Sequence, residues 1–434
     1  MNTLPNDNKN IHIEIINTGS ELMLGRVLNT HHQWLALQLD ELGYTIDRQL
    51  CINDDNLSIT GAVRESLSRA DLIIVTGGLG PTSDDLTRND IAQLLGRRLL
   101  VDSGTIERIQ NMFSRRGTPI PFNCEIQAQY PEGALIIPND YGTAPGLAIE
   151  FFPNLFRKNQ QKSFIILLPG PPRELYPMFR NSVIPLLRKK FPFASAHKLL
   201  NLRTACTGES SIEKIVAPHL QYLVKEGLQI GYCARVGEVD FRLEASGQKA
   251  DEILKQAEQI AREKLGEIIF GTGTQKLEEV LIQLLTQHHK TLGTAESCTG
   301  GFLSHRLTNV PGASAVFMGS CVTYSNDFKR QLLGVQNETL EKWGAVSEQT
   351  SIEMASGMRT RMNLDYALSI TGIAGPGGGT PEKPVGTVYI GLATPEGTFS
   401  QRLYCPYERE SFKFYVSQFA LDWLRRTIIH SLNP

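Results

Sequence analysis

The sequence predicts a multidomain α/β protein, and three observations support this fold class. The chain has 434 residues, which exceeds one ordinary core, so we expect two to four domains of about 100–200 residues each. Short apolar runs typical of buried parallel strands alternate with segments of helical periodicity. Glycine-rich turns follow several of these runs, as they do where α/β domains bind ligands at the carboxyl ends of their strands.

The first predicted domain covers residues 1–172. Residues 11–16, 72–76 and 163–168 are apolar and rich in β-branched side chains, whereas residues 33–42 and 86–95 have helical spacing. A glycine and proline turn at 77–81 joins the second strand to a helix, which is the order of a doubly wound domain. The sequence Pro-Gly-Pro-Pro at 169–172 interrupts regular structure and predicts the domain boundary.

The second predicted domain, residues 173–270, is a small split βαβ module of the KH or ferredoxin-like kind. We expect strands at 199–206, 229–234 and 239–245, a helix at 210–216 capped by Ser210 or Ser211, and a second helix at 250–265. Modules of this kind bind RNA when they carry a G-x-x-G loop or exposed aromatic strands. Neither is evident, so a spacer or interface role is favoured.

The third predicted domain, residues 271–434, is again α/β. A helix begins at Leu277 with apolar residues at i, i+3, i+4, i+7 and i+8. Strands are expected at 291–295, 315–324, 366–370 and 385–393, and helices at 302–307, 347–362 and 411–429. The turn at 395–397 predicts a hairpin between 385–393 and 398–404.

The composition argues against several classes of partner. The formal net charge is −2 and no basic stripe is present, so we expect no nucleic-acid partner. No apolar run approaches the roughly 18 residues of a membrane helix, so we expect no membrane partner. The seven cysteines are scattered and form no C-x-x-C pair, which indicates neither a zinc site nor disulfides and favours a cytoplasmic location.

The densest cluster of reactive side chains is the stretch Ala-Glu-Ser-Cys-Thr-Gly-Gly at 295–301. A nucleophile such as Ser297 on a strand-to-helix turn is exposed, and N–H groups at the helix start can bind an oxyanion. The alternative is that Ser297 or Thr299 only caps the helix. Cys298 is a rival nucleophile, but a thiol needs a nearby imidazole or cation to ionise, and His305 lies about two helical turns away.

Two further clusters belong to the same predicted domain. Tyr324 and Lys329 follow a strand, and a lysine whose pKa is lowered in a dry pocket can deprotonate a serine directly. A glycine-rich stretch at 371–379 follows another strand and could bring backbone N–H groups close to a phosphate. It lacks the Gly-Lys-Ser/Thr of a P-loop, and it could also be a flexible loop without function.

These motifs, in their order and spacing, resemble the C-terminal nicotinamide-nucleotide amidase domain of the CinA (competence/damage-inducible protein A) family. The resemblance implies hydrolysis of the carboxamide of nicotinamide mononucleotide to nicotinic acid mononucleotide and ammonia, without a cofactor. It implies that Ser297 is the nucleophile, Lys329 its general base and Tyr324 a neighbouring participant. The substrate-binding residues implied by the motifs are Glu296, Cys298, Thr299, Gly300, Gly301, Asn326, Thr371, Gly372, Ala374, Gly375, Gly377 and Arg409.

The first predicted domain resembles the molybdopterin-binding-like domain of the same family, which in some members is a metal-dependent ADP-ribose pyrophosphatase. Its nucleotide site would comprise Thr18, Glu21, Asn29, Gly77, Gly78, Gly80, Thr82, Asp84 and Asp85. The glycines could surround a diphosphate while Asp84 and Asp85 hold a divalent metal ion. The alternative is that one of these aspartates caps the next helix.

Two departures from the family pattern weaken the pyrophosphatase interpretation. The usual Thr-x-Glu is Thr-Arg-Asn at 87–89, and the expected Lys-Gln-Ala is Ile-Gln-Ala at 126–128. Each change removes a charge that diphosphate chemistry uses, and residues 153–163 look like an insertion. We therefore expect the C-terminal domain to be an active amidase. A catalytically inactive N-terminal domain stays an open alternative. A homodimer is expected from the family, and a non-enzymatic role in competence or DNA damage is the remaining alternative.

Overall fold

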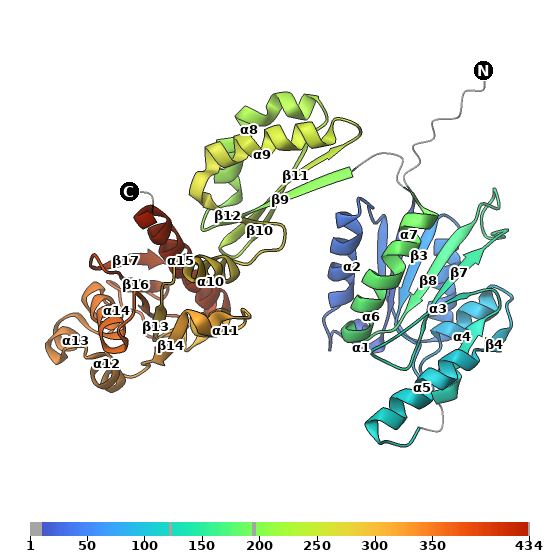
Figure 1. The fold of residues 1–434 in the computed structure, drawn as a ribbon, viewed down its shortest axis with the longest axis horizontal. Helices are drawn as coiled ribbons and strands as arrows, with labels where there is room; N and C mark the ends of the chain where they lie inside the picture. The colour runs from blue at the N-terminus through green and yellow to red at the C-terminus, as the bar shows by residue number, and fades with distance from the viewer. Residues whose placement is uncertain (1–10, 121–123, 193–196, 433–434) are drawn as a thin grey trace. The chain divides into compact units, whose positions relative to one another are not determined.

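The computed structural model describes residues 11–120, 124–192 and 197–432, which form two compact units divided at residues 197 and 198 (Figure 1). Among the described residues, no helix is long and apolar enough to cross a membrane.

The N-terminal unit is built on a six-stranded sheet in the order β2-β1-β3-β8-β7-β6. Strands β1 (Ile13–Thr18), β2 (Arg48–Ile52), β3 (Leu72–Thr76) and β8 (Ser163–Leu168) are parallel, whereas β7 (Gly146–Phe151) and β6 (Leu135–Ile137) add an antiparallel edge. The remaining elements are α1 (Ser20–Met23), α2 (Thr30–Glu41), α3 (Asn56–Leu67), α4 (Thr87–Leu94), β4 (Leu99–Val101), α5 (Ser103–Arg116), η1 (Cys124–Ala128), β5 (Gln129–Pro131), α6 (Pro172–Met178), η2 (Phe179–Val183) and α7 (Ile184–Lys190).

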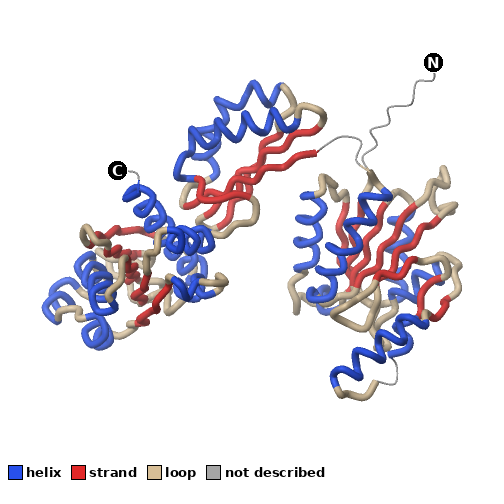
Figure 2. The backbone as a smooth tube through the Cα atoms, in the orientation of Figure 1, coloured by secondary structure: helices blue, strands red, loops and turns tan. Residues whose placement is uncertain are grey.

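The two faces of this sheet form separate cores, as Figure 2 shows by the helices that cover both sides. Alternate side chains of β3 divide between them, with Leu72 and Ile74 in one core and Ile73 and Val75 in the other. The central strands β3 and β8 are therefore buried along their whole length and are apolar except for Thr76 and Ser163 at their ends, because helices cover both faces of the sheet there. This confirms the doubly wound interpretation.

The first domain boundary predicted from the sequence is wrong. Pro172 is the first residue of α6 rather than part of a linker, since proline suits the first helical turn, where its missing N–H is not needed. Leu175, Phe179 and Leu187 are fully buried against the N-terminal core. The domain predicted to end at 172 therefore includes α6, η2 and α7.

The second unit begins with a module in which β9 (His197–Ala205), β10 (Gln229–Arg235), β11 (Glu238–Ser246) and β12 (Ile269–Thr272) form a sheet in the order β10-β11-β9-β12. Helices α8 (Glu209–Lys225) and α9 (Ala250–Leu265) share one apolar core with it. The KH-like or ferredoxin-like prediction is confirmed. The first helix is longer than predicted, with Gly208 rather than Ser210 or Ser211 at its N-cap, and it continues through Pro218.

The C-terminal domain has a five-stranded sheet in the order β14-β13-β15-β16-β17. Strands β13 (Leu292–Glu296), β14 (Phe317–Val322) and β15 (Tyr366–Gly372) are parallel, and β16 (Thr387–Ala393) forms the predicted hairpin with β17 (Thr398–Tyr404). The helices are α10 (Leu277–Gln287), α11 (Phe302–Thr308), α12 (Asn326–Leu333), α13 (Asn337–Trp343), α14 (Glu348–Met362) and α15 (Arg409–Leu432), with short η3 (Gly266–Ile268) and η4 (Ala313–Ala315). The sequence analysis did not predict α12 and α13.

A buried polar chain joins the KH-like module to the C-terminal domain. Glu238 on β11 accepts a hydrogen bond of 2.9 Å from Gln418 on α15. Gln418 in turn accepts one of 2.6 Å from Arg306 on α11, which also pairs with Glu278. Because all four side chains are buried, the module is fixed to the domain, in agreement with the interface role expected from the sequence.

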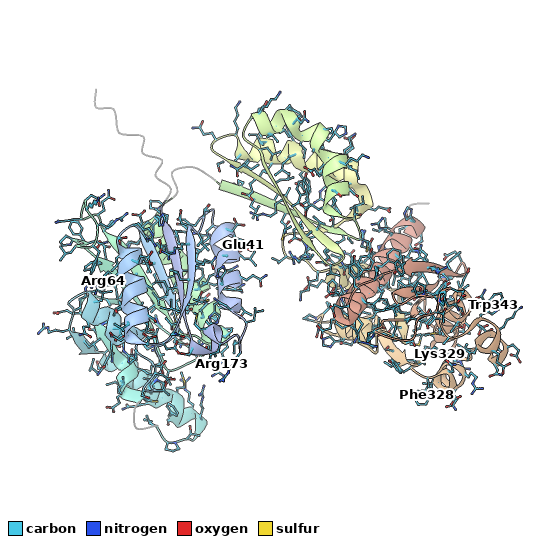
Figure 3. The ribbon with its side chains drawn as sticks, turned by 180° about the vertical axis from the view of Figure 1, so that it is seen from behind. Glu41, Arg64, Arg173, Phe328, Lys329 and Trp343 are labelled. Atoms are coloured by element: carbon cyan, nitrogen blue, oxygen red, sulfur yellow. The ribbon has the colours of Figure 1, made fainter. Side chains whose placement is uncertain are left out.

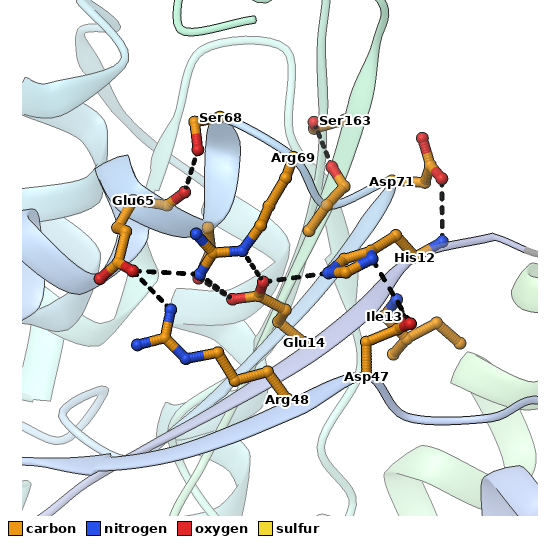
Figure 4. Close-up of polar contacts among 12 residues, drawn as sticks. His12, Ile13, Glu14, Asp47, Arg48, Glu65, Ser68, Arg69, Asp71 and Ser163 are labelled. Carbon is orange, nitrogen blue, oxygen red and sulfur yellow. Dashed lines mark hydrogen bonds and ion pairs between the residues drawn. The ribbon is translucent and has the colours of Figure 1, made fainter.

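A buried carboxylate holds the start of β1 in the N-terminal unit (Figure 4). The fully buried Glu14 accepts hydrogen bonds from Arg69, from the Ser66 hydroxyl at 2.6 Å, and contacts the His12 ring at 3.2 Å. Burial alone would raise the pKa of Glu14, but the bonds from Arg69, Ser66 and His12 outweigh it and lower the pKa below its usual value. The carboxylate is thus held in its charged form.

We predict that Glu14→Ala lowers the free energy of unfolding by roughly 2 kcal/mol. Breaking a fully buried ion pair costs about 3–5 kcal/mol, and the loss is smaller here because Arg69 is partly exposed. Since the pKa of Glu14 is lowered in the folded state, its contribution is present above the unfolded pKa of about 4.3 and is lost as the pH falls. Urea unfolding at pH 7 and pH 4 measures both effects. Equal losses at the two pH values would contradict the assignment.

Candidate active site

The candidate site lies where the three parallel strands of the C-terminal sheet end. Ser297 directly follows β13, and its backbone N–H donates to the carbonyl of Ile370 on β15 at 2.9 Å. On the other side, the N–H of Thr323 donates to the carbonyl of Glu296 at 2.8 Å. The central position of β13 therefore brings the loops after β14 and β15 to either side of Ser297.

The structure brings Ser297 and Lys329 together. Lys329 Nζ lies 3.0 Å from Ser297 Oγ and donates a hydrogen bond of 2.7 Å to the carbonyl oxygen of Thr323. Lys329 is 1% exposed and Ser297 is 9% exposed. The predicted nucleophile and general base thus meet within the distance that direct proton transfer requires.

The environment of Lys329 favours its neutral form. Burial lowers the pKa of its ammonium group to about 8, because no carboxylate of the described chain pairs with it and burial disfavours the charged form. A minor fraction of the amine is therefore neutral at pH 7, and about half of it is neutral at pH 8. The neutral amine has the lone pair needed to accept the proton of the Ser297 hydroxyl.

Helix α12 positions Lys329, and its local sequence explains why. The Ser325 side chain caps the helix by accepting a hydrogen bond of 3.2 Å from the N–H of Phe328, and the left-handed Gly334 ends it. Lys329 and Leu333, four residues apart, form the buried face of the helix, while the neighbouring Phe328 is half exposed (Figure 3). The Ser and Gly end signals were available in the sequence, but this short helix lacks a long apolar period.

Cys298 is not prepared for nucleophilic attack. Its side chain lies in the apolar core beneath the site, and burial raises the pKa of its thiol to about 12. A thiol in that state stays protonated and is a poor nucleophile. The burial of the thiol therefore favours Ser297 over Cys298, and the assignment of the serine as nucleophile stays a prediction.

The structure corrects the expected role of Glu296. Its fully buried carboxylate accepts hydrogen bonds of 3.0, 3.0 and 2.8 Å from the N–H groups of Gly301, Leu303 and Ser304, and one of 2.8 Å from the Ser304 hydroxyl. These bonds occupy both carboxylate oxygens, so Glu296 caps α11 rather than contacting substrate. They also occupy the helix-start N–H groups that the sequence analysis offered as an oxyanion site.

Two backbone donors in the turn between β13 and α11 lie outside this helix cap, although both hydrogen-bond the Cys298 sulfur. Within the described chain, the backbone N–H groups of Cys298 and Thr299 donate to no oxygen, and the buried Thr299 hydroxyl has no partner. Gly300 and Gly301 have φ angles of 61° and 94°, which L side chains rarely adopt. The glycines therefore shape the turn, and the substrate contacts expected of Cys298 and Thr299 stay a prediction.

Two other predicted residues stand at the edge of the site. Tyr324 is 67% exposed and Asn326 is exposed, and the described structure shows no hydrogen bond from either side chain. Sequence reasoning missed their neighbour Thr323, whose backbone carbonyl holds Lys329. A backbone contact leaves no signature in residue identity. Participation of Tyr324 and Asn326 stays a prediction.

The glycine-rich stretch after β15 is anchored at its start and at Gly375, whereas residues 376–382 are exposed. The buried Thr371 hydroxyl donates to the carbonyl of Ala345 at 2.7 Å, and Gly372 packs so tightly on β16 that a Cβ would lie 2.8 Å from Val388. Arg409, at the start of α15, donates to the carbonyl of Gly375. Ala374 is buried, whereas the space around Gly377 is open.

The glycine turn of the N-terminal domain is shaped by close packing. A Cβ on Gly77, Gly78 or Gly80 would lie 2.6, 2.1 and 2.4 Å from side-chain oxygens of Thr18, Thr87 and Asp85. Asn29 accepts the N–H of His32 at 3.1 Å and so caps α2. These contacts fix the backbone of the turn. The shape of the turn is compatible both with a purely structural role and with ligand binding. Glu21 is exposed in α1.

The paired aspartates do not assemble a metal site in the described residues, which contain no group of three or more potential ligands placed to hold a metal ion. Asp85 accepts the N–H of Thr82 at 3.0 Å and also its hydroxyl, and the Thr82 hydroxyl lowers the pKa of Asp84. The sequence analysis missed Asp54, whose pKa is raised by burial and by the charges of Glu21, Asp84 and Asp85. The divalent metal ion therefore stays a prediction.

Comparisons with known proteins cover the whole domain arrangement. Residues 14–189 match the family model described as "Probable molybdopterin binding domain", residues 200–271 match "Damage-inducible protein CinA KH domain", and residues 274–428 match "CinA C-terminal domain". These limits agree with the elements described above, including the extension of the first domain beyond residue 172.

Relatives resemble the chain over nearly its full length. A CinA-like protein of Akkermansia muciniphila is 42% identical over 422 residues, which are 96% of this chain and 97% of the relative. A CinA-like protein of Kosmotoga olearia is 41% identical over 419 residues, 96% of this chain and 98% of the relative. The crystal structure of competence/damage inducible protein CihA from Agrobacterium tumefaciens is 41% identical, covering 35% of this chain and 92% of its own, with a TM-score of 0.34. The chain belongs to the CinA family, with a molybdopterin-binding-like domain, a KH-like module and a CinA C-terminal domain.

Proposed function

We propose that the C-terminal domain is an amidase that hydrolyses the carboxamide of nicotinamide mononucleotide to nicotinic acid mononucleotide and ammonia. The observation that carries the proposal is the buried contact of 3.0 Å between Lys329 Nζ and Ser297 Oγ, with the pKa of Lys329 lowered to about 8. A serine paired with a neutral amine is a nucleophile with its own base. The resemblance of the surrounding motifs to the family's amidase domain supplies the substrate.

In the first half of the reaction, Ser297 Oγ bonds to the carboxamide carbon while its proton passes to Lys329 Nζ. The carbonyl oxygen becomes an oxyanion. When the intermediate collapses, the C–N bond breaks, and the ammonium of Lys329 returns the proton to the departing nitrogen, which leaves as ammonia. The product of this half is an ester between Ser297 and the nicotinoyl group.

In the second half, water replaces ammonia. Lys329 accepts a proton from the attacking water, the oxygen of water bonds to the ester carbon, and the bond to Ser297 Oγ breaks as that oxygen regains a proton. The acid product then leaves as a carboxylate. The carbonyl of Thr323 holds Nζ at 2.7 Å through its own hydrogen bond, so the amine needs no repositioning between the two halves.

Backbone groups are the best donors for the oxyanion. The N–H groups of Cys298 and Thr299 adjoin the nucleophile and have no oxygen acceptor within the described chain. Donors fixed by the fold stabilise a developing charge without reorganising during the reaction. Glu296 acts indirectly, since its bonds to α11 fix the turn that carries these donors.

The glycine loop and Arg409 are proposed to receive the substrate's phosphate. One N–H group of the Arg409 guanidinium donates a hydrogen bond to the carbonyl of Gly375. Within the described residues the other N–H groups of this guanidinium have no partner. The open backbone around Gly377 permits close approach of an anion. Substrate and catalytic residues would then meet at one edge of the sheet.

ADP-ribose hydrolysis by the N-terminal domain is the alternative from the sequence, and the described residues favour it less, because they contain no group of three potential ligands placed to hold a metal ion. Incubating the full chain separately with nicotinamide mononucleotide and ADP-ribose, with and without divalent metal, tests both. The proposal expects nicotinic acid mononucleotide and ammonia, with turnover unchanged in EDTA. Metal-dependent cleavage of ADP-ribose alone would replace it with the pyrophosphatase.

We predict that Ser297→Ala lowers kcat for nicotinamide mononucleotide by at least about a thousandfold, because the covalent route is lost. The matched variant Cys298→Ala, next to it in the chain, should keep kcat within about threefold, the scatter expected when no bond to the reacting atoms is lost. Ammonia release measures both. If activity disappears in Cys298→Ala and survives in Ser297→Ala, the thiol is the nucleophile and the mechanism fails.

We predict that kcat/KM rises with pH until it levels off above about 8, the pKa of Lys329, since only the neutral amine accepts the serine proton. Lys329→Met should lower the rate by at least about a hundredfold and remove this inflection. Lys342→Met is the control, because Lys342 lies on α13 over the ring of Trp343 rather than at Ser297. A profile that keeps its inflection in Lys329→Met would exclude Lys329 as the base.

A further inference from the structure

A second candidate site lies in the N-terminal domain, in a pocket of about 620 Å³ between α5 and the loop that follows β6. The volume falls in the range of about 300–1,000 Å³ typical of small-molecule sites. Three arginines, Arg108, Arg115 and Arg116, line this pocket together with the carboxylates Glu107 and Asp140. None of the side chains proposed for the glycine turn of this domain lines it.

The guanidinium of Arg108 lacks hydrogen-bond acceptors for two of its nitrogen atoms. Its Nε and Nη2 atoms are buried and have no hydrogen-bond partner in the described structure. Burial lowers the pKa of its guanidinium, and the negative charges of Asp140 and Asp102 only oppose that effect. A covered guanidinium without an acceptor is costly. An anion that enters the pocket, with a small turn of this side chain, would supply the missing acceptor.

The other two arginines extend the positive surface along the same helix. Arg115 and Arg116 lie seven and eight residues after Arg108 on α5, two turns on, and so share its face. Within the described residues neither has a hydrogen bond or ion pair. At 1.5 Å per residue the backbone positions of the three arginines span about 12 Å along the helix axis. This spread suits a ligand with more than one phosphate better than a single compact anion.

The opposite wall of the pocket is fixed in place. The buried Asn139 accepts the N–H groups of Tyr141 and Gly142 at 3.0 and 2.9 Å, and donates to Ala144 and Glu174 at 2.8 Å each. The loop therefore needs no folding when a ligand enters. Glu107 and Asp140 also line the pocket, but neither forms an ion pair with its arginines in the described structure, so three positive groups face two negative ones.

We propose that this pocket is an anion-binding site for a diphosphate-bearing small molecule, with Arg108 as its main anchor and Arg115 and Arg116 as secondary contacts. Guanidinium groups bind phosphate oxygens in pairs through parallel N–H donors. The site needs no divalent metal, because the arginines supply the positive charge. It is distinct from the glycine turn at 77–80 and gives the N-terminal domain a binding role that does not depend on catalysis.

Titration calorimetry of the full chain with inorganic pyrophosphate, in EDTA and at low ionic strength, tests the proposal. Arg108→Gln should weaken the affinity at least about tenfold, the loss of one charge-assisted contact, and Arg108→Lys should weaken it less, because the charge remains without the paired donors. Arg64→Gln is the control, since Arg64 is exposed on α3 (Figure 3). Circular dichroism confirms that each variant folds.

A second ligand and a second variant test whether the pocket prefers phosphate and whether pyrophosphate binds there rather than at the glycine turn. Citrate, a carboxylate of similar charge, should bind more weakly than pyrophosphate, and equal or tighter citrate binding would overturn the phosphate assignment. Thr82→Ala tests the rival nucleotide site predicted at the glycine turn, and the proposal expects a smaller loss of pyrophosphate affinity in this variant than in Arg108→Gln. The site is refuted if pyrophosphate does not bind, if Arg108→Gln binds like the unmodified chain, or if the loss occurs only in Thr82→Ala.

Discussion

The chemistry proposed for this protein depends on one buried contact, the approach of the Lys329 amine to the Ser297 hydroxyl. Burial does two things at once, because it lowers the pKa of Lys329 to about 8 and raises that of the adjacent Cys298 thiol to about 12. The same apolar surroundings that prepare the amine as a base therefore silence the competing nucleophile. The proposed mechanism therefore requires apolar, water-excluding packing around β13 and α12 in addition to the two reacting groups.

Much of the structure supports this contact from a distance. Glu296, one residue before the nucleophile, caps α11 and fixes the turn. The far end of α11 carries Arg306, which is linked through Gln418 to Glu238 in the KH-like module. Buried hydrogen-bonded charges of this kind specify one arrangement of the packed elements. The module thereby supports the helix that follows the nucleophile, which gives it a structural role independent of any nucleic acid.

The strands and the reactive side chains were predicted from the sequence more accurately than the hydrogen-bond partners of those side chains. The apolar runs at 72–76 and 163–168 and the helix at 250–265 match the observed elements, since local periodicity determines them. The cap formed by Glu296 and the carbonyl of Thr323 were missed, because hydrogen bonds to the backbone depend on tertiary geometry. Pro172 was misread for a similar reason: a proline can end an element or begin one, and only packing against the core decides which.

The account depends most on the charge state of Lys329. The most direct test is an NMR titration of the full chain with isotope-labelled lysine, in which the signal absent from Lys329→Met identifies the residue. The account predicts a midpoint near 8, with the signal of the exposed Lys342 serving as a reference in the same sample. A midpoint for Lys329 near the ordinary lysine value of about 10.4 would contradict it, because the amine would then be charged at working pH and could not accept the serine proton.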